Sequence, residues 1–300
     1  MYDLRRMQML LEIHERGTVI AAANALNLTP SAISQQIANL EKEAGVQLLR
    51  RVGRRVQLTS AGLIVVEAAR TILGEIDRMT TNVASLAEEA AGVVKLAIFQ
   101  SAAFALLPGA LTYLKEHAPQ LTLKVLQIDP ETGLSLTRSR EYDMVLTESY
   151  PQHPSPQYTD LHTELLVEDP LHLIVPEDSG ITSIRQAHSI GWALEREQNT
   201  SAQWATNQCR LAGFEPDIRF HANDMITNST LVRSGHAASI VSGFVLAALS
   251  NAEGIRVVEL PNSPYRSIYT AVRKDSANNP AVAMVREAMH YAVQQRVSHK

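Results

Sequence analysis

The stretch from Thr29 to Gly45 constrains the fold of this chain most, because it reads as one short helix with two unlike faces. Thr29 suits the N-cap, and Pro30 suits the first helical position, where its missing N–H costs nothing. Gly45 suits the end of the helix. One face is apolar at helical spacing: Ile33, Ile37 and Leu40. The other face is polar, so we expect this helix to cover a core with one side only.

A second helix precedes this one closely. Residues 19–26 are rich in Ala, Thr18 offers a cap, and Asn27 tolerates the left-handed conformation that a tight turn needs. The pair predicts a helix-turn-helix, whose second helix enters the major groove of DNA and contacts base edges near its N-terminus. A polar-faced helix in an ordinary helical bundle is the alternative that the pattern alone leaves open.

The candidate DNA-contacting side chains are of two kinds. The first kind lies on the polar face of the helix: Thr29, Ser31, Ser34, Gln35 and Asn39. Gln and Asn amides can pair bidentately with adenine, whereas Ser is less selective. The second kind belongs to a hairpin that we expect from two short strands, around residues 47–50 and 55–58. Its basic residues suit phosphates or a minor groove: Arg50, Arg51, Arg54 and Arg55.

The distribution of charge supports a separate nucleic-acid-binding module. Residues 1–59 hold eight Lys and Arg against five Asp and Glu, a net charge of +3. The rest of the chain holds 19 against 26, a net charge of −7. A basic head on an acidic body is the asymmetry of a DNA-binding module joined to another domain.

Length and residue usage limit the class of protein. Three hundred residues indicate two or more domains. No run approaches eighteen apolar residues, so we expect no membrane span. The first residues lead into a polar-interrupted helix rather than a secretory signal, and the single Cys209 cannot form an intrachain disulfide. We therefore expect a cytoplasmic protein.

A long helix is expected from Thr59 or Ser60 to about Glu89. Within it, small and apolar side chains alternate at spacings of three and four: Val66, Ala69, Leu73, Ile76, Thr80, Val83 and Ala87. Such a heptad seam favours a coiled-coil-like contact between two copies of the chain. The alternative is an amphipathic helix packed on its own domain.

From Gly92 onward, strand-like and helical segments alternate. The expected strands lie at 93–99, 121–127, 142–147, 165–175, 189–194, 218–220, 238–241, 255–260 and 268–272. The expected helices lie at 101–117, 201–212, 224–234, 243–250 and 280–297. This alternation predicts a mainly parallel sheet with helices on both faces.

The run AAANALNLTPSAISQQIANLEKEAG, followed by VQLLRRVGRRVQLTSAG, resembles the N-terminal signature of the LysR-type transcriptional regulators. These residues match the family pattern in order and without gaps: Ala22, Ala23, Leu26, Pro30, Ser34, Ile37, Leu40, Glu41, Gly45, Leu48, Arg51, Leu58, Thr59 and Gly62. Four positions depart from the pattern or vary within it. Asn27 occupies a turn position that varies in the family, and Ala44 replaces a common Leu. Leu49 stands where the family usually has Phe, and Ile20 stands where many members have a capping Ser or Thr, so the first helix of the motif relies on Thr18.

The resemblance implies a mixed fold. An N-terminal all-α winged helix-turn-helix (1–59) would be followed by a linker helix for dimerisation (60–91). A C-terminal α/β effector domain, similar to periplasmic solute-binding proteins, would have two lobes: 92–160 with 268–300, and 161–267. The chain crossings near 160 and 268 would act as hinges. The resemblance also implies double-stranded DNA as partner, a dimer or tetramer, a small-molecule effector between the lobes, and contact with RNA polymerase.

Candidate effector-binding residues follow predicted strands or open predicted helices, where ligands bind in open α/β sheets. They are Gln100, Ser101, Thr147, Glu148, Asn199, Thr200, Ser201 and Ser242. The matching position in the family often carries a hydroxyl that holds the effector, and Ser101 fits it. A simple N-cap remains the alternative for each. Hydroxyl groups suit an anionic metabolite, but Glu148 opposes one, so the effector's charge stays open.

Other chemistry finds little support in the sequence. The histidines at 153, 162 and 172 lack metal-ligand spacing, and no nucleotide-binding or hydrolase motif occurs. We therefore expect no enzyme activity and no cofactor other than the effector. A solute-binding protein or an enzyme with a helical dimerisation head is the competing hypothesis, and it predicts that residues 92–300 suffice for function.

Overall fold

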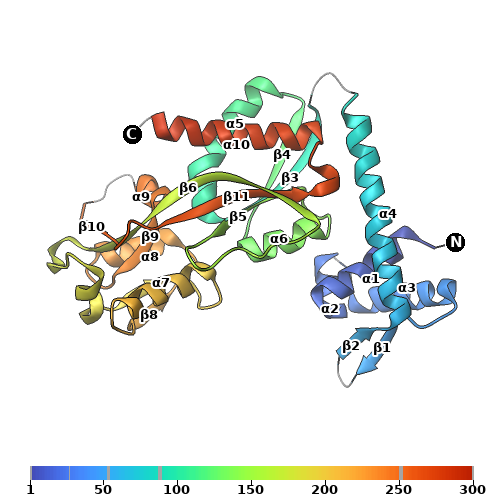
Figure 1. Ribbon diagram of the computed structural model, residues 1–300, viewed down its shortest axis with the longest axis horizontal. Coiled ribbons are helices and arrows are strands. Elements are labelled where there is room, and N and C mark those ends of the chain that lie inside the picture. The colour runs from blue at the N-terminus through green and yellow to red at the C-terminus, as the bar shows by residue number, and fades with distance from the viewer. Residues whose placement is uncertain (1, 27, 53–54, 87–89, 250–252, 299–300) are drawn as a thin grey trace.

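The computed structural model describes residues 2–26, 28–52, 55–86, 90–249 and 253–298. The chain forms a small N-terminal head, one long helix, and a larger two-lobed domain (Figure 1). Among the described residues, no helix combines the length and the apolar character that a membrane crossing requires.

The head contains three helices and a hairpin: α1 (Leu4–Arg16), α2 (Val19–Ala25), α3 (Pro30–Ala44), β1 (Leu49–Val52) and β2 (Arg55–Leu58). The two strands pair antiparallel. The predicted caps are confirmed, because Thr18 accepts from the backbone N–H of Ala21 at 3.1 Å and Thr29 accepts from that of Ala32 at 3.2 Å. Gly45 ends α3 in the left-handed conformation, at φ 72°. The first strand begins two residues later than predicted.

The long helix α4 (Ser60–Ala84) ends earlier than the predicted position near Glu89, which itself lies outside the described residues. Its first half completes the core of the head. The predicted seam is wrong there, because Val66, Ala69 and Leu73 are buried in that core, largely against α1. Because these side chains are already buried against the chain's own helices, they have no exposed apolar surface left for a contact with a second copy of the chain.

A different apolar stripe of α4 faces solvent. It consists of Ile64, Ile72, Ile76, Met79 and Val83, all of them exposed. The members lie three, four or eight residues apart, so they share one side of the helix. Ile76 and Val83 of the predicted seam belong to this stripe, Thr80 is exposed beside it, and Ala87 lies outside the described residues.

The two-lobed domain is built on one seven-stranded sheet, in the order β10-β6-β11-β5-β3-β4, with β9 paired to β6. Its strands are β3 (Gly92–Ile98), β4 (Leu121–Gln127), β5 (Met144–Ser149), β6 (Leu161–Pro176), β9 (Ser239–Ser242), β10 (Ile255–Glu259) and β11 (Tyr265–Arg273). Among the described strands of this sheet, the parallel pairs are those of β3 with β4 and with β5. The expectation of a mainly parallel sheet is therefore wrong, because the long strands β6 and β11 run antiparallel to their neighbours.

Helices cover this sheet in both lobes. The first lobe carries α5 (Gln100–His117), α6 (Pro130–Arg138) and α10 (Pro280–Ser298). The second carries α7 (Thr200–Leu211), α8 (Met225–Arg233), α9 (Gly243–Ala248) and a small parallel pair, β7 (Trp192–Leu194) with β8 (Ile218–His221). Short 3-10 turns lie at Glu177–Ser179, Ile184–Ser189 and Lys274–Ser276.

Each lobe has its own core, and β6 and β11 connect the two. Leu166 belongs to the core of the first lobe, whereas Leu171 belongs to that of the second. The chain therefore changes lobes within β6, several residues after the expected crossing near 160. The return takes place between Leu260, in the core of the second lobe, and Ile268, in that of the first, beside the other expected hinge.

Candidate functional sites

The polar face of α3 is open to solvent. Thr29, Ser31, Ser34 and Gln35 are exposed and Asn39 is half-buried, while the opposite face fills the core of the head. The Oγ of Ser34 donates to the Pro30 carbonyl at 2.8 Å. The predicted exposure of this face is thus confirmed, and contact with DNA stays a prediction.

The hairpin beside α3 carries the basic residues that the sequence singled out. Arg50 is exposed and donates to Gln57 across the hairpin at 3.3 Å. Arg51 lies on β1 and Arg55 on β2, whereas Arg54 lies outside the described residues.

A carboxylate on α3 fixes the hairpin in place. Glu41 accepts from the backbone N–H groups of Leu48 and Leu49, at 2.8 and 3.1 Å. Both bonds join the end of α3 to the start of β1, so the hairpin keeps a fixed position relative to the polar face of α3.

A cavity of about 260 Å³ lies between the two lobes. All eight predicted effector-binding residues line it: Gln100, Ser101, Thr147, Glu148, Asn199, Thr200, Ser201 and Ser242. They come from the ends of β5 and β9 and from the beginnings of α5 and α7. The rule that ligands bind beyond the ends of strands therefore led to the residues that line this cavity.

Arg266 of β11 also lines the cavity, and no sequence pattern singled it out. Its side chain is 5% exposed and forms ion pairs with Glu148 at 2.6 Å and Asp169 at 2.7 Å. It also donates to the hydroxyls of Ser101 and Ser242, each at 2.8 Å. These partners come from both lobes, so the guanidinium ties together the floor of the cleft.

Burial and ion pairing act in opposite directions on this cluster. Burial lowers the pKa of Arg266, but the carboxylates of Glu148 and Asp169 outweigh it, so the guanidinium pKa lies above its ordinary value. Burial raises the pKa of Glu148 despite the opposing effect of Arg266. The guanidinium also lies over the rings of Phe99 and Phe244, 5.2 and 5.9 Å from their centroids.

Two of the predicted effector-binding residues bridge the lobes directly. Gln100 of α5 donates to Asp224 at 3.0 Å and accepts from the backbone N–H of Met225 at 2.9 Å, both at the start of α8. Thr200 of α7 donates to Glu131 of α6 at 3.0 Å. These bonds hold the cleft in its present closure, so Gln100 and Thr200 act between lobes as well as facing the cavity.

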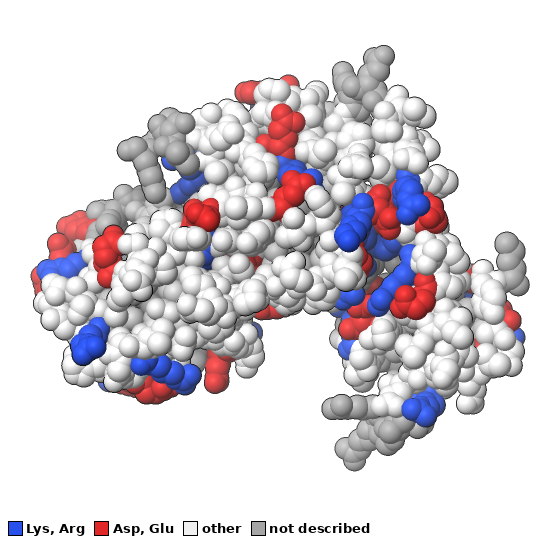
Figure 2. All heavy atoms as spheres, viewed as in Figure 1, with Lys and Arg blue, Asp and Glu red and all other residues white. Residues whose placement is uncertain are grey.

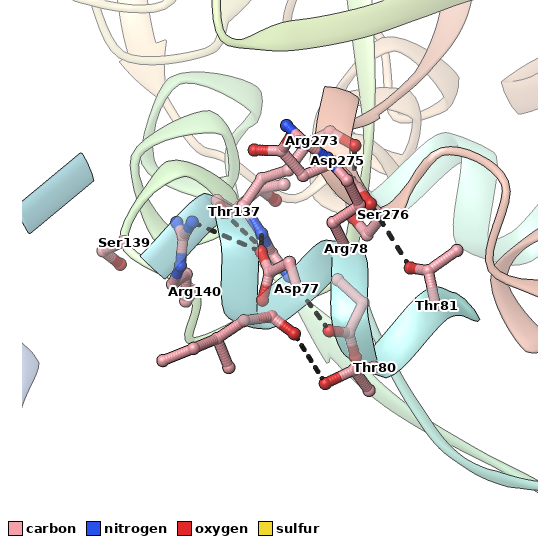
Figure 3. Close-up of polar contacts among 12 residues, drawn as sticks. Asp77, Arg78, Thr80, Thr81, Thr137, Ser139, Arg140, Arg273, Asp275 and Ser276 are labelled. Carbon is pink, nitrogen blue, oxygen red and sulfur yellow. Dashed lines mark hydrogen bonds and ion pairs between the residues drawn. The ribbon is translucent and has the colours of Figure 1, made fainter. Parts of the chain in front are cut away.

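The second half of α4 contacts the first lobe through charged and polar groups (Figure 3). Asp77 accepts from Arg273 at 2.8 Å and forms an ion pair with Arg140 at 3.4 Å. Arg78 pairs with Asp275 at 3.2 Å, and the hydroxyl of Thr81 donates to the Asp275 carbonyl at 3.3 Å. Arg273 also donates to the carbonyls of Thr137 and Tyr142, so one arginine of β11 links α4 to the lobe interior.

Helix α1 of the head meets the same lobe. Arg16 bridges Glu12 of the head, at 2.8 Å, and Glu141 of the lobe, at 2.9 Å, while Arg138 of the lobe pairs with Glu15 at 2.7 Å. Figure 2 shows positive and negative side chains gathered where the head and α4 meet the larger domain. Burial raises the pKa of Glu12 from 4.5 to about 7, against the lowering effect of Arg16.

Metal chemistry gains no support from the part of the chain that the structure describes, where no group of three His, Cys, Asp or Glu side chains could hold an ion. Cys209 is buried, and burial raises the pKa of its thiol to about 12. A thiol of such high pKa is a poor nucleophile.

The chain matches known families over both of its parts. Residues 4–63 match the helix-turn-helix described as a bacterial regulatory protein of the lysR family, and residues 87–294 match the LysR substrate binding domain. The dual regulator GltC of Bacillus subtilis is 26% identical over 244 residues, or 80% of each chain. The regulator AlsR of the same species is 28% identical over 247 residues, again 80% of each.

Solved structures share the fold. A full-length OxyR variant from Pseudomonas aeruginosa aligns with a TM-score of 0.68 at 18% identity, covering 96% of this chain and 95% of that one. The regulator CbnR, solved with its target DNA, aligns with a TM-score of 0.54 at 22% identity, covering 97% and 99%.

Proposed function

Because this chain belongs to the LysR family of bacterial transcriptional regulators, we propose that its head reads an operator through α3 and that a small molecule between the lobes modulates this binding. The observation that carries the proposal is the exposed polar face of α3. This helix is capped by Thr29 and lies beside the β1–β2 hairpin, which forms the wing. In such a motif the recognition helix lies in the major groove and the wing reaches the backbone. The relatives are regulators rather than enzymes.

Dimerisation through α4 would give this head a two-fold related mate. The exposed stripe of Ile64, Ile72, Ile76, Met79 and Val83 is an apolar surface on α4 that its own domain leaves uncovered. Two heads related by symmetry would read half-sites about one helical turn apart. Pairing of dimers into tetramers, contact with RNA polymerase and a cytoplasmic location are further steps of the same proposal, and we propose no cofactor besides the effector.

The lobes and the head are joined closely enough for a ligand to act on DNA binding. Arg266 at the cleft and Arg273 at α4 belong to the same strand, β11, seven residues apart. A ligand that favours one relative arrangement of the lobes would shift β11, and with it the end of β11 that carries Arg273, relative to α4. It can change DNA affinity only by its differential affinity for the two arrangements.

A binding titration of the full chain against the DNA upstream of its own gene tests the proposal. Gln35→Ala should reduce discrimination between operator variants about tenfold, and Arg50→Ala should weaken binding to all sequences and flatten the salt dependence. Gln295→Ala is the matched control, because Gln295 is exposed on α10 in the other domain. An unchanged operator preference in Gln35→Ala would place the recognition face elsewhere.

A further inference from the structure

The ionisable groups around the interlobe cavity are mostly acidic. Its lining includes the carboxylates of Asp129, Glu131, Glu148 and Glu195, and Arg266 is the one Lys or Arg among the described residues that line it. Four acids against one base leave the walls with a negative formal charge. This imbalance bears on the charge of the effector, which the sequence had left open.

Most of the donor capacity of Arg266 is already used within the protein. All three of its nitrogens already donate: Nε to Asp169, one terminal nitrogen to Glu148, and the other to Asp169, Ser101 and Ser242. A guanidinium carries five N–H groups, and its two carboxylate partners already neutralise its charge. A ligand carboxylate that bound the guanidinium through two N–H groups would have to displace one of these buried partners, which would leave a carboxylate unpaired in the protein interior.

Helix N-termini near the cavity are also largely provided with anionic groups. Asp129 caps α6 by accepting from the Thr132 N–H at 2.8 Å, and Asp169 accepts from the Phe244 N–H of α9 at 3.0 Å. These carboxylates use the N–H groups that would otherwise attract an anionic ligand. Among the helices that open on the cavity, α5 and α7 begin without a side-chain cap. At α7 two carboxylates already lie beside the first turn, because Glu131 accepts from Thr200 and Glu195 accepts from Ser201. The start of α5 therefore remains available to an uncharged or anionic part of a ligand.

Two carboxylates in the wall have only neutral partners within the described chain. Glu131 accepts from the Thr200 hydroxyl, and Glu195 accepts from the Ser201 hydroxyl and the Asn199 amide. Both therefore flank the first turn of α7. Glu195 also raises the pKa of nearby Glu148, after the larger effect of burial. A positive charge at this point would relieve the repulsion between Glu195 and Glu148.

A buried acceptor in the same wall adds an independent indication. Asn228 lines the cavity, is 1% exposed, and donates its amide N–H to the Ala222 carbonyl at 3.1 Å. Its Oδ1 has no hydrogen-bond partner among the described residues. Buried polar atoms are nearly always paired, so an acceptor without a partner at a cavity wall points to a donor supplied by a ligand.

We propose that the effector is a small organic cation, whose protonated amine or guanidinium group is held against Glu195 and Glu131 beside the first turn of α7. The inference rests on the proposed function, in which the cleft is the effector site. Ammonium and guanidinium groups carry several N–H donors and no acceptor, which matches carboxylates and an amide oxygen that lack cationic or donor partners.

Thermal unfolding of the full chain with matched probes tests the charge of the effector. Agmatine and 1,4-diaminobutane are the cationic probes, and adipate has the same four-methylene spacer with a carboxylate at each end. A cell extract of metabolites, separated on cation and anion exchangers, supplements these pure compounds. We expect a cationic probe or the cation-exchange fraction to raise Tm by about 3 °C or more, whereas adipate and the anion-exchange fraction do not.

Two variants locate the bound cation. Glu195→Gln should weaken the affinity of the stabilising probe about tenfold, because a charge-assisted hydrogen bond is lost. Glu197→Gln is the matched control, since Glu197 is exposed two residues away and does not line the cavity. Stabilisation that survives Glu195→Gln would place the cation elsewhere and overturn the assignment.

The remaining outcomes separate this inference from the proposed function. Stabilisation by adipate, or by an anionic or unretained fraction, would overturn the cationic class while leaving an effector site in the cleft. If no probe and no fraction changes either Tm or operator binding, the effector function of the cleft fails, and this inference fails with it.

Discussion

Gly62 of α4 packs directly against the backbone of Leu48, the residue before β1. A Cβ at this position would lie 2.2 Å from the Leu48 carbonyl oxygen and 2.9 Å from the Cδ2 of Leu58. Gly74, on the same helix, would meet a side-chain oxygen of Asp275 at 2.5 Å. The Leu48 backbone cannot move away from an added Cβ without shifting the hairpin that forms the wing, whereas the flexible side chain of Asp275 can rotate away.

These two glycines therefore make a matched pair. We expect Gly62→Ala to lower the free energy of unfolding by about 2 kcal/mol or more, because the wing has to shift. We expect Gly74→Ala to cost less, since Asp275 can rotate and Ala favours a helix over Gly by about 1 kcal/mol. Urea denaturation of both variants measures the difference, and equal losses would contradict this account.

Glu12 makes stability depend on pH. It is fully buried in α1, and its raised pKa of about 7 means that folding favours the protonated carboxyl. Its contribution to stability is therefore complete below pH 4.5 and is lost as the pH rises through about 7. Glu12→Gln should match the wild type at pH 5 and exceed it at pH 8 by on the order of 2 kcal/mol.

Denaturation curves at the two pH values check this prediction, with Glu116→Gln as the control at an exposed position. A variant that is less stable than the wild type at pH 8 would show that the charged form of Glu12 is the favoured one. Arg16 retains its bond to Glu141 in the variant, so contact between head and lobe should persist.

Among the elements, those with strong local signals were predicted well. The caps and apolar spacing of α3 depend on residues within one helix, and they fixed its bounds, its buried face and its exposed face. Helix α6 was missed, because its nine residues are largely polar and carry only Leu134 and Leu136 as large apolar groups, two positions apart. That spacing resembles a strand more than a helix.

Features that depend on pairing between segments distant in the chain could not be predicted from local sequence patterns. Arg266 lies opposite Asp169 because β11 pairs antiparallel with β6, and no local pattern contains that register. The cavity residues at strand and helix ends were found, because a general rule places ligands there. The heptad spacing of α4 was real, but the sequence could not show which stripe its own head would bury.

The exposed stripe of α4 predicts the effect of charge on dimerisation. Met79→Lys should shift the chain toward monomer in sedimentation experiments and weaken binding to a two-half-site operator, because a buried charge at such an interface is unpaired. Thr71→Lys is the control, since Thr71 is exposed on α4 outside the stripe and has Glu67 and Glu75 one turn away on either side. A dimer that persists in Met79→Lys would exclude this stripe as the interface.

At the scale of the whole molecule, communication between cleft and head depends on where α4 is attached. Its first half belongs to the core of the head, and its second half contacts the first lobe through Asp77, Arg78 and Thr81. The first contact is apolar and the second polar. The weaker, polar contact is therefore where we expect the lobes to move relative to the head.

Asp77→Ala should loosen this contact without unfolding either part. Arg273 would keep its bonds to two carbonyls but lose its shortest carboxylate partner, so amides at 274–277 should exchange hydrogen at least about tenfold faster. Exchange in the core of the head, at Leu10 and Ile33, should not change, and operator affinity should stay within about threefold because α3 is untouched. Glu67→Ala is the control on the exposed side of α4. Faster exchange throughout the head would instead mean that the contact with the lobe stabilises the head's own fold, and the polar contact could then not serve as the place where the two parts move.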